Sequence, residues 1–520
     1  MPYELNSENI QICKPVKTSL LKSVIDTDII VPDTKPDVFH ILQVNALSSI
    51  NEKYVQKDII TVSGYVDFTI LYCGPEDFSD IKTINYKAPF TQQIEAKGID
   101  ENFGNYVLTD VSHIEYEICN SRKINVKTVV SFETGIAGCA NIDSVSSIVS
   151  AINIPCKKEK INALNMTVCC ENKFEIYDEF KIFNSRDENI EILKLDCKIV
   201  PEEHKTMNNK VVAKGTLNTD ILYSRNGDVC HVENETPFTE VMDVENISPD
   251  MHTEMKYCIC SSNCNSAFDS EDAILSIETQ VNLVICGYEE NTYNVLTDTY
   301  CPDYETEVAF EKLDYCKVSE SFEKNIGINK TVELSEDEPS FLKIYNVKTK
   351  PLTDSIAAYD GYCVLDGHIN AEILYLSDDE ERYIYSSHKK IPFTQKIENK
   401  CFNLNSKINS DVSLEHSGYV IKNDKSLELR NTLKLSMMVM EECSQNIVSS
   451  LSIDENSPTS KEAYAGITLY FPDENENLWD VAKKYSTTIE EIALINKIEP
   501  DTVLSENHRL VIPKRVNNIV

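Results

Sequence analysis

The chain has 520 residues, of which 42% are hydrophobic and 26% are charged, a composition typical of globular domains. Its 85 acidic and 49 basic side chains give a net charge of −36. This charge argues against contact with nucleic acid or an anionic membrane surface, since both need clustered Lys and Arg. The first residues lack the basic and apolar regions of a secretory signal, and no apolar run approaches the roughly 20 residues that cross a bilayer. We therefore predict no nucleic-acid partner, no membrane span, and a protein that stays in the compartment where it is made.

One segment with the alternation of a β-strand is repeated three times along the chain. Each copy has a Gly eight residues before a Tyr, at Gly64, Gly215 and Gly367. The steps between these glycines are 215 − 64 = 151 and 367 − 215 = 152 residues. The segments are VSGYVDFTILY, AKGTLNTDILY and LDGHINAEILY, and each is followed by Pro-Phe-Thr, beginning at Pro89, Pro237 and Pro392. A period this regular predicts tandem copies of one domain.

The repeated segments alternate apolar and polar residues, which predicts strands with one face in water. Antiparallel sheets that are solvated on one side have this pattern. The Gly inside each strand predicts a bulge, a bend or a close backbone approach rather than a ligand contact. We therefore predict a mainly β chain with three tandem antiparallel β-rich domains.

The spacing of the repeats divides the chain into eight predicted segments. In chain order these are a lead-in (1–25), repeat 1 (26–135), a connector (136–165), repeat 2 (168–290), a connector (291–325), repeat 3 (326–442), a flexible linker (443–464) and a C-terminal module (465–515). The second connector reads either as a linker or as an extra edge strand. The flexible linker is predicted from its polar, Ser-rich sequence and from Pro458.

Beyond the linker the apolar period changes from two to 3.6. Residues 467–470 predict a short strand, and residues 478–485 place an apolar stripe on a helix. Thr488 is a suitable cap for a second helix with Glu490 and Glu491 in its first turn. Residues 510–512 return as a strand. The module is therefore predicted to be α+β, in the order strand, helix, helix, strand.

This module resembles a LysM domain. The residues that match are Leu478-Trp479-x-Val481-Ala482-x-Lys484-Tyr485, Ile489-x-Glu491-Ile492, Asn496 and Leu510-x-Ile512-Pro513. The resemblance implies binding of N-acetylglucosamine glycans, chiefly peptidoglycan, through the loop after the first strand and the loop before the last. Both loops depart from the family: residues 473–477 replace a Gly-Asp-Thr turn, and residues 505–508 lack the preferred Gly.

The three repeats resemble the SPOCS-type domains of spore-coat morphogenetic proteins from clostridial endospore formers. The match rests on the Gly-to-Tyr strand and the Pro-Phe-Thr after it, over residues 26–442. The resemblance implies a mother-cell cytosolic protein that settles on the forespore surface and helps to localise and encase the coat. It also implies two kinds of partner, other spore-coat proteins and a SpoIVA-like morphogenetic ATPase engaged through the LysM domain.

Three residues of the module are candidates for contact with a partner. Trp479 is the only tryptophan of the chain and stands beside Leu478 at the start of a helix. Helix packing is one interpretation of this Trp, and an aromatic anchor in an interface is the other, since Trp is enriched among interface hot spots. Ile467 on the first strand is the third candidate.

The 18 cysteines are irregularly spaced and do not occupy matching positions in the three copies, which predicts reduced, mostly buried thiols in a cytosol. Cys258, Cys260 and Cys264, near His252, offer thiolates for zinc. Their spacing is not the usual C-x2-C, and the first two alternate along a predicted strand. We therefore predict no metal and no cofactor, with these three thiols as the metal-ligand candidates.

No sequence signal of catalysis is found. The chain contains no G-x-S-x-G, no H-E-x-x-H and no phosphate-binding loop. A hydrolase within the repeats would need matched acid and base residues in at least one copy, and none is evident. Taken with what the two resemblances imply, this absence leads us to predict a non-enzymatic spore-coat scaffold that binds a SpoIVA-like protein through its LysM module. The alternative is a peptidoglycan-binding protein of the cell wall or cortex.

Overall fold

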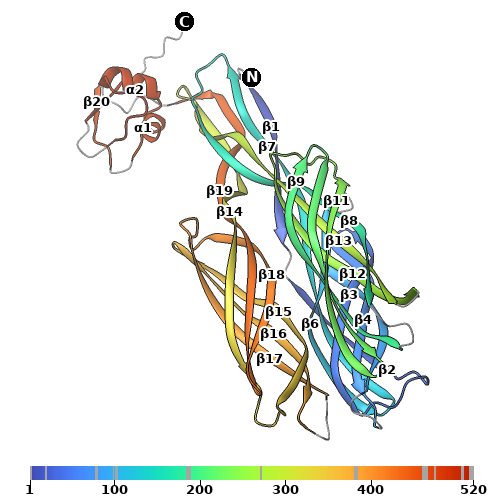
Figure 1. Cartoon of the computed structure of the whole chain (residues 1–520). Coiled ribbons are helices and arrows are strands. Elements are labelled where there is room, and N and C mark those ends of the chain that lie inside the picture. The colour runs from blue at the N-terminus through green and yellow to red at the C-terminus, as the bar shows by residue number, and fades with distance from the viewer. Residues whose placement is uncertain are drawn as a thin grey trace.

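The computed structural model describes residues 3–17, 20–75, 80–97, 99, 104–182, 189–269, 272–379, 384–459, 467–473, 476–504 and 509–513. These residues are almost entirely β-strand, with two short helices near the C-terminus (Figure 1). The first third of the chain contains β1 (Tyr3–Lys17), β2 (Leu21–Ile30), β3 (His40–Gln56), β4 (Ile59–Cys73), β5 (Ile81–Glu95), β6 (Asn105–Asn120) and β7 (Lys123–Ser150). The second third contains β8 (Cys156–Ile182), β9 (Ile190–Met207), β10 (Lys210–Arg225), β11 (Asp228–Asp243), β12 (His252–Asp269) and β13 (Asp272–Thr299). The last part contains β14 (Tyr304–Glu333), β15 (Phe341–Tyr359), β16 (Tyr362–Ser377), β17 (Ile384–Glu398), β18 (Ser406–Asn423), β19 (Ser426–Pro458), β20 (Ile467–Tyr470), α1 (Leu478–Lys484), α2 (Ile489–Asn496) and β21 (Leu510–Pro513).

Each repeat folds as two packed antiparallel sheets. In repeat 1 the sheet β3-β4-β5 faces β2 and β6, which flank β7. The corresponding sheets are β9-β10-β11 and β12-β13-β8 in repeat 2, and β15-β16-β17 and β14-β19-β18 in repeat 3. The apolar side chains of the alternating strands point between the sheets, because that is the face from which the fold excludes water. The predicted fold class, three antiparallel β-rich repeats followed by an α+β module, is therefore confirmed.

The Gly of each repeat lies opposite the Phe of its Pro-Phe-Thr. Gly64 in β4 pairs with Phe90, and the other two copies have the same pairing. A Cβ atom built on Gly64 would lie 1.9 Å from the carbonyl oxygen of Ser49 and 2.9 Å from the Phe90 ring. The ladder with the preceding strand shifts register beside each Gly. The structural interpretation of these glycines, a bulge with a close backbone approach, matches this geometry.

Long strands continue beyond the sandwiches and form a shared stem. We define the stem as residues 3–17, 135–150, 156–165, 289–299, 304–318 and 440–458, which make three antiparallel ribbons. One layer of its core consists of Val145, Leu296 and Val448. These positions are separated by 296 − 145 = 151 and 448 − 296 = 152 residues, the same steps as the repeat glycines. The stem is therefore part of the repeating unit.

The stem corrects several predicted boundaries. The lead-in (1–25) supplies β1 and the start of β2, and the connector at 136–165 is part of β7 and β8. The connector at 291–325 is part of β13 and of β14, which is an edge strand of its sheet, as one of its two interpretations predicted. Of the predicted flexible linker (443–464), residues 443–458 continue β19 and pair with β14, whereas residues 460–464 lie outside the described residues. Polar, Ser-rich sequence forms strand here because the ladder with β14 satisfies its backbone and only one face packs on the stem core.

The three repeats also meet through their sheets β3-β4-β5, β9-β10-β11 and β15-β16-β17. A small apolar cluster there contains Leu71, Leu222 and Leu374, which are related by the same steps of 151 and 152 residues. Figure 1 shows the three sandwiches side by side, with the stem running from them toward the C-terminal module. Repeats 1, 2 and 3 therefore share one buried centre in addition to the stem.

Polar residues surround this apolar centre, and equivalent positions differ between the repeats. The positions occupied by Asn45 and Lys348 in repeats 1 and 3 correspond to Asp196 in repeat 2. Lys348 Nζ lies 2.5 Å from Asp196 Oδ1, and Lys194 Nζ lies 2.8 Å from Asp196 Oδ2. Lys194, which is 5% exposed, also donates to Gln43 Oε1 at 3.2 Å. Because these side chains are complementary rather than identical, they favour one order of the repeats around the centre.

Asp196→Ala is expected to destabilise the folded chain by about 3–5 kcal/mol, since Lys194 is left buried without its ion-pair partner. Burial alone raises the pKa of Asp196, but Lys194 and Lys348 outweigh it and hold the pKa well below its usual range. A carboxyl group with a lowered pKa stabilises the fold above its unfolded pKa of about 3.9, and this stabilisation is lost as the pH falls through the folded pKa. Urea unfolding at neutral pH and at about pH 3 measures both effects.

The matched control for this prediction is Asp67→Ala, which breaks the exposed ion pair of Asp67 with Lys87 at 3.0 Å and is expected to have little effect. Equal urea midpoints for the Asp196 and Asp67 variants would contradict the assignment of Asp196 to the buried centre.

Candidate partner-binding site

The C-terminal module folds as the sequence predicts. β20 pairs with β21 antiparallel, and the two helices lie between these strands in the sequence. Asn477 caps α1, and Thr488 forms a capping box with Glu491 at the start of α2. Asn496, at the end of α2, donates to the carbonyl of Val511 at 2.8 Å and accepts from its N–H at 2.7 Å. These bonds fix β21 against the second helix.

Trp479 joins the module to the stem. Its indole lies against Tyr300 with ring centroids 5.1 Å apart in an edge-to-face arrangement, and its Nε1 donates to Asp298 Oδ2 at 2.8 Å. Lys483 reaches both carboxylate oxygens of Asp298, at 2.7 and 2.8 Å. The Tyr300 hydroxyl donates to the carbonyl of Thr487 at 2.8 Å. Aromatic burial and charged hydrogen bonds therefore hold the module on the end of the stem.

The three sequence candidates occupy different environments. Leu478 is 2% exposed in the core of the module, and Trp479 is 7% exposed in its contact with the stem. Ile467 is paired with Pro513 in the backbone ladder, and its side chain lies outside the described residues. Trp479 thus acts as an aromatic anchor within the chain, against Tyr300. A role of the three candidates in binding another protein stays a prediction.

Sequence reasoning missed Asp298 and Tyr300, although a signal for them existed. The steps of 151 and 152 residues relate Tyr300 to Val149 in repeat 1 and to Ser452 in repeat 3. Neither Val149 nor Ser452 offers both a ring and a hydroxyl. Only repeat 2 therefore has the two residues that contact Trp479. The difference between the repeats at these positions is visible when the three stem segments are aligned.

A pocket of about 890 Å³ lies between the module and the stem. The module lines it with residues 476–479 before and within α1, with the start of α2, and with residues 500–503 before β21. The opposite side consists of Asn153 and residues 155–157, at the end of the stem. The loop residues 505–508, which the sequence analysis singled out, lie outside the described residues. The described residues 476 and 477 of the loop after β20, and residues 500–503, thus face a wall that belongs to another part of the chain.

Apolar side chains are also exposed on the module away from its core. Leu469 in β20 is 61% exposed and Phe471, two positions later, is 58% exposed. The guanidinium of Arg509 lies 6.0 Å from the centre of the Phe471 ring. We call Leu469 and Phe471 the β20 patch. Exposed apolar side chains next to each other are typical of contact surfaces.

The structure does not bring the three candidate thiols together. Cys258 Sγ is directed to the carbonyl of Thr109, whereas Cys264 packs in the core of repeat 2. Burial raises the pKa of Cys258 to about 12 and that of Cys264 to about 11, which disfavours the thiolate that zinc needs. Among the residues that the structure describes, one group of three potential ligands lies within 4.8 Å, and it contains no cysteine: Asp220, His231 and Glu233.

Neither described helix has the length and apolarity that a membrane-spanning helix requires.

The fold and the module together define a multidomain β-sandwich protein with a LysM module on the end of a stem. Family models identify both parts: the SipL SPOCS domain matches residues 37–119, 190–266 and 341–422, and the LysM domain matches residues 474–513. The chain therefore carries three regions that match the SipL SPOCS domain and one LysM domain, which relates it to the sporulation coat. Both families are in general binding or scaffold domains. No curated protein and no solved structure matches the chain.

Proposed function

We propose that the chain is a non-enzymatic scaffold of spore-coat assembly that binds a SpoIVA-like morphogenetic protein through its LysM module. In this proposal it works in the mother-cell cytosol at the forespore surface and helps to localise and encase the coat. The observation that carries the proposal is the attachment of the module, which Trp479 holds on the stem while Leu469 and Phe471 stay exposed.

The proposal gives the sequence candidates separate roles. β20, with Ile467 and Leu469, and the adjoining Phe471 contact the partner. Leu478 and Trp479 are positioning residues, because they are buried and act by holding the module together and on the stem. A rigid mount lowers the entropy that binding costs, since the module does not have to be immobilised when the partner arrives.

The test measures binding of the full chain to purified SpoIVA by titration calorimetry. The double variant Leu469→Ser, Phe471→Ser is expected to weaken binding at least tenfold, as loss of an interface anchor does. The matched control is Val24→Ser, which removes a 64% exposed apolar side chain from repeat 1 and is expected to bind like the unchanged protein. Wild-type affinity in the double variant, or equal loss in both variants, would contradict the proposed contact.

Glycan binding is the second candidate, and the pocket of about 890 Å³ between the module loops and the stem favours it. A glycan chain would have to enter beside Lys157 of the stem and Pro155, which precedes it. Sedimentation of the full chain with purified peptidoglycan distinguishes the two functions. Binding to peptidoglycan with no affinity for SpoIVA would overturn the scaffold proposal and support the second candidate.

A further inference from the structure

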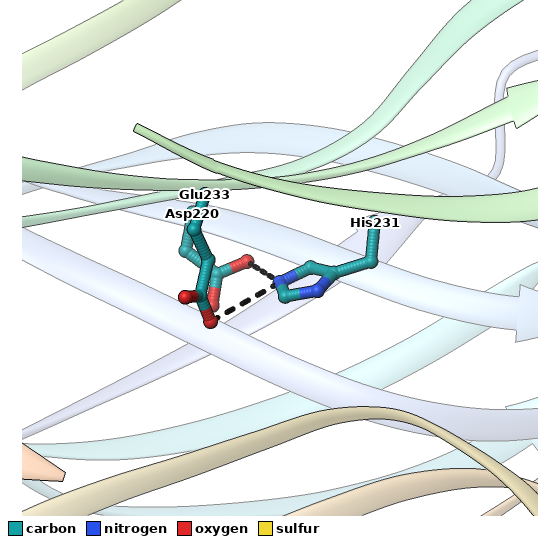
Figure 2. Close-up of side chains that lie close together, drawn as sticks. All are labelled: Asp220, His231 and Glu233. Atoms are coloured by element: carbon teal, nitrogen blue, oxygen red, sulfur yellow. Dashed lines mark hydrogen bonds and ion pairs between the residues drawn. The ribbon is translucent and has the colours of Figure 1, made fainter. Parts of the chain in front are cut away.

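The group of Asp220, His231 and Glu233 lies at the boundary between repeats 2 and 3. Figure 2 shows one nitrogen of the imidazole facing both carboxylates: His231 Nε2 is 2.7 Å from Asp220 Oδ1 and 3.9 Å from Glu233 Oε1. Asp220 is in β10, and Glu233 is its direct partner across the ladder in β11. His231 shares its face of β11 with Glu233, because they are two positions apart. One imidazole and two carboxylates thus converge on one point.

A fourth group reaches this point from repeat 3. The side chain of Asn346 in β15 places its Nδ2 2.6 Å from Asp220 Oδ2 and 3.3 Å from His231 Nε2. Asn346 is 6% exposed, and its Oδ1 is buried without a hydrogen-bond partner. A buried amide oxygen without a partner costs free energy, so it is a specific indication that a donor or a cation belongs there. A half-turn of the amide would present Oδ1 to a cation held by Asp220 and His231.

The charges around the group leave room for a cation. The lysines near it are Lys194 and Lys348, and both form ion pairs with Asp196. The carboxylates of Asp220 and Glu233 are negative charges beyond the one that these two lysines already pair with. The charge of Glu372 also lies near Lys348 and raises its pKa. The hydrogen bond to Asp220 raises the pKa of His231, so in the metal-free protein a proton is the competitor for the same nitrogen.

Among the residues that the structure describes, the group of one imidazole and two carboxylates is found in repeat 2. The registers of the ladders relate His231 to Thr83 in repeat 1 and to Ser386 in repeat 3, because each lies opposite the equivalent leucine. They relate Asp220 to Thr69 in repeat 1 and to Glu372 in repeat 3, and Glu372 lies opposite His388 where Asp220 lies opposite Glu233. A structural role common to all three copies therefore does not account for the imidazole of His231 beside two carboxylates, although repeat 3 keeps a carboxylate at the position of Asp220.

We propose that Asp220, His231, Glu233 and Asn346 form a binding site for a divalent first-row metal cation. Imidazole nitrogen together with carboxylate and amide oxygens is a donor set that suits Mn²⁺ or Zn²⁺. Because Asn346 comes from repeat 3 and the other ligands come from repeat 2, the bound cation joins the two repeats. This inference is independent of the proposed coat function.

The test titrates Mn²⁺ into the metal-free full chain and follows free Mn²⁺ by electron paramagnetic resonance. Mn²⁺ is chosen because it prefers oxygen and imidazole over the many thiols of this chain. One site per chain is expected to bind more tightly than the acidic surface does, and to raise the unfolding temperature by stabilising the folded state. His231→Gln and Glu233→Gln are each expected to weaken this site at least tenfold.

Glu233→Gln keeps the test interpretable, because the Glu233 side chain is 76% exposed and its loss does not threaten folding. The matched control is His113→Gln, which removes an exposed imidazole 3.1 Å from the carboxylate of Glu115, and it is expected to leave the tight site intact. A wild-type titration without a site tighter than the acidic surface would overturn the proposal. Unchanged binding in Glu233→Gln, or equal loss in His113→Gln, would also overturn it.

Discussion

Trp479→Ala is expected to release the LysM module from the stem and to destabilise its first helix. The change removes a ring that is 7% exposed, the edge-to-face contact with Tyr300 and the hydrogen bond to Asp298. Truncation of a buried Trp costs about 3–5 kcal/mol. Because the module is small and its core includes Tyr300, this loss is concentrated there rather than in the sandwiches. Amide hydrogen exchange of residues 467–513 in the full chain measures the effect.

Two further variants separate docking from folding of the module. Asp298→Asn weakens the charged contact with Lys483 but leaves the core of the module intact, so exchange is expected to rise at residues 298–300, whereas α1 keeps its protection. Val503→Ala removes a side chain that is 85% exposed and is expected to change nothing. Unaltered protection of α1 in Trp479→Ala would show that the indole does not hold the module.

Gly64→Ala is expected to have the largest effect of any single methyl group added to the repeats, about 3 kcal/mol of lost stability. The added Cβ would lie 1.9 Å from the Ser49 carbonyl oxygen, which is backbone and cannot turn aside. Either β3 must move away from β4, or the bulge beside Ile50 must be lost. Urea unfolding followed by circular dichroism measures the change in midpoint.

The matched control for Gly64 is Gly327→Ala, since Gly327 also lies in a strand but a Cβ there meets no atom within 4 Å. It is expected to be neutral or slightly stabilising, because Ala loses less backbone freedom on folding. A Gly64 variant as stable as the Gly327 variant would contradict a close backbone approach as the reason for the repeat glycine.

The sequence was sufficient to predict the strands, their antiparallel arrangement and the repeat, because the alternation at each Gly-to-Tyr segment has a direct physical cause in burial on one face. The stem was not predicted. Each ribbon of the stem buries a single face, and it does so against the other two ribbons. A polar stretch such as 443–458 therefore has no local apolar pattern that would predict a strand. The period itself contained the information, since Leu5, Cys156 and Val308 follow the same steps of 151 and 152 residues and meet in the stem core.

The partner-binding candidates show a similar division. The caps and apolar stripe of the LysM module are local features, and Thr488 and Asn477 act in the structure as caps. The environment of Trp479 depends on Asp298 and Tyr300, which are roughly 180 residues away in the chain, and no local signal connects them. The sequence also did not predict the proposed cation site at His231, since Asn346 reaches it from another repeat.

Hydrogen exchange of the full chain with and without saturating SpoIVA tests the central claim most directly. If the LysM module presents the β20 patch to this partner while it stays mounted on the stem, residues 467–473 gain protection and residues 298–300 keep the protection that they have in the free chain. Saturable binding with new protection only in the three sandwiches, and none in residues 467–473, would contradict the account.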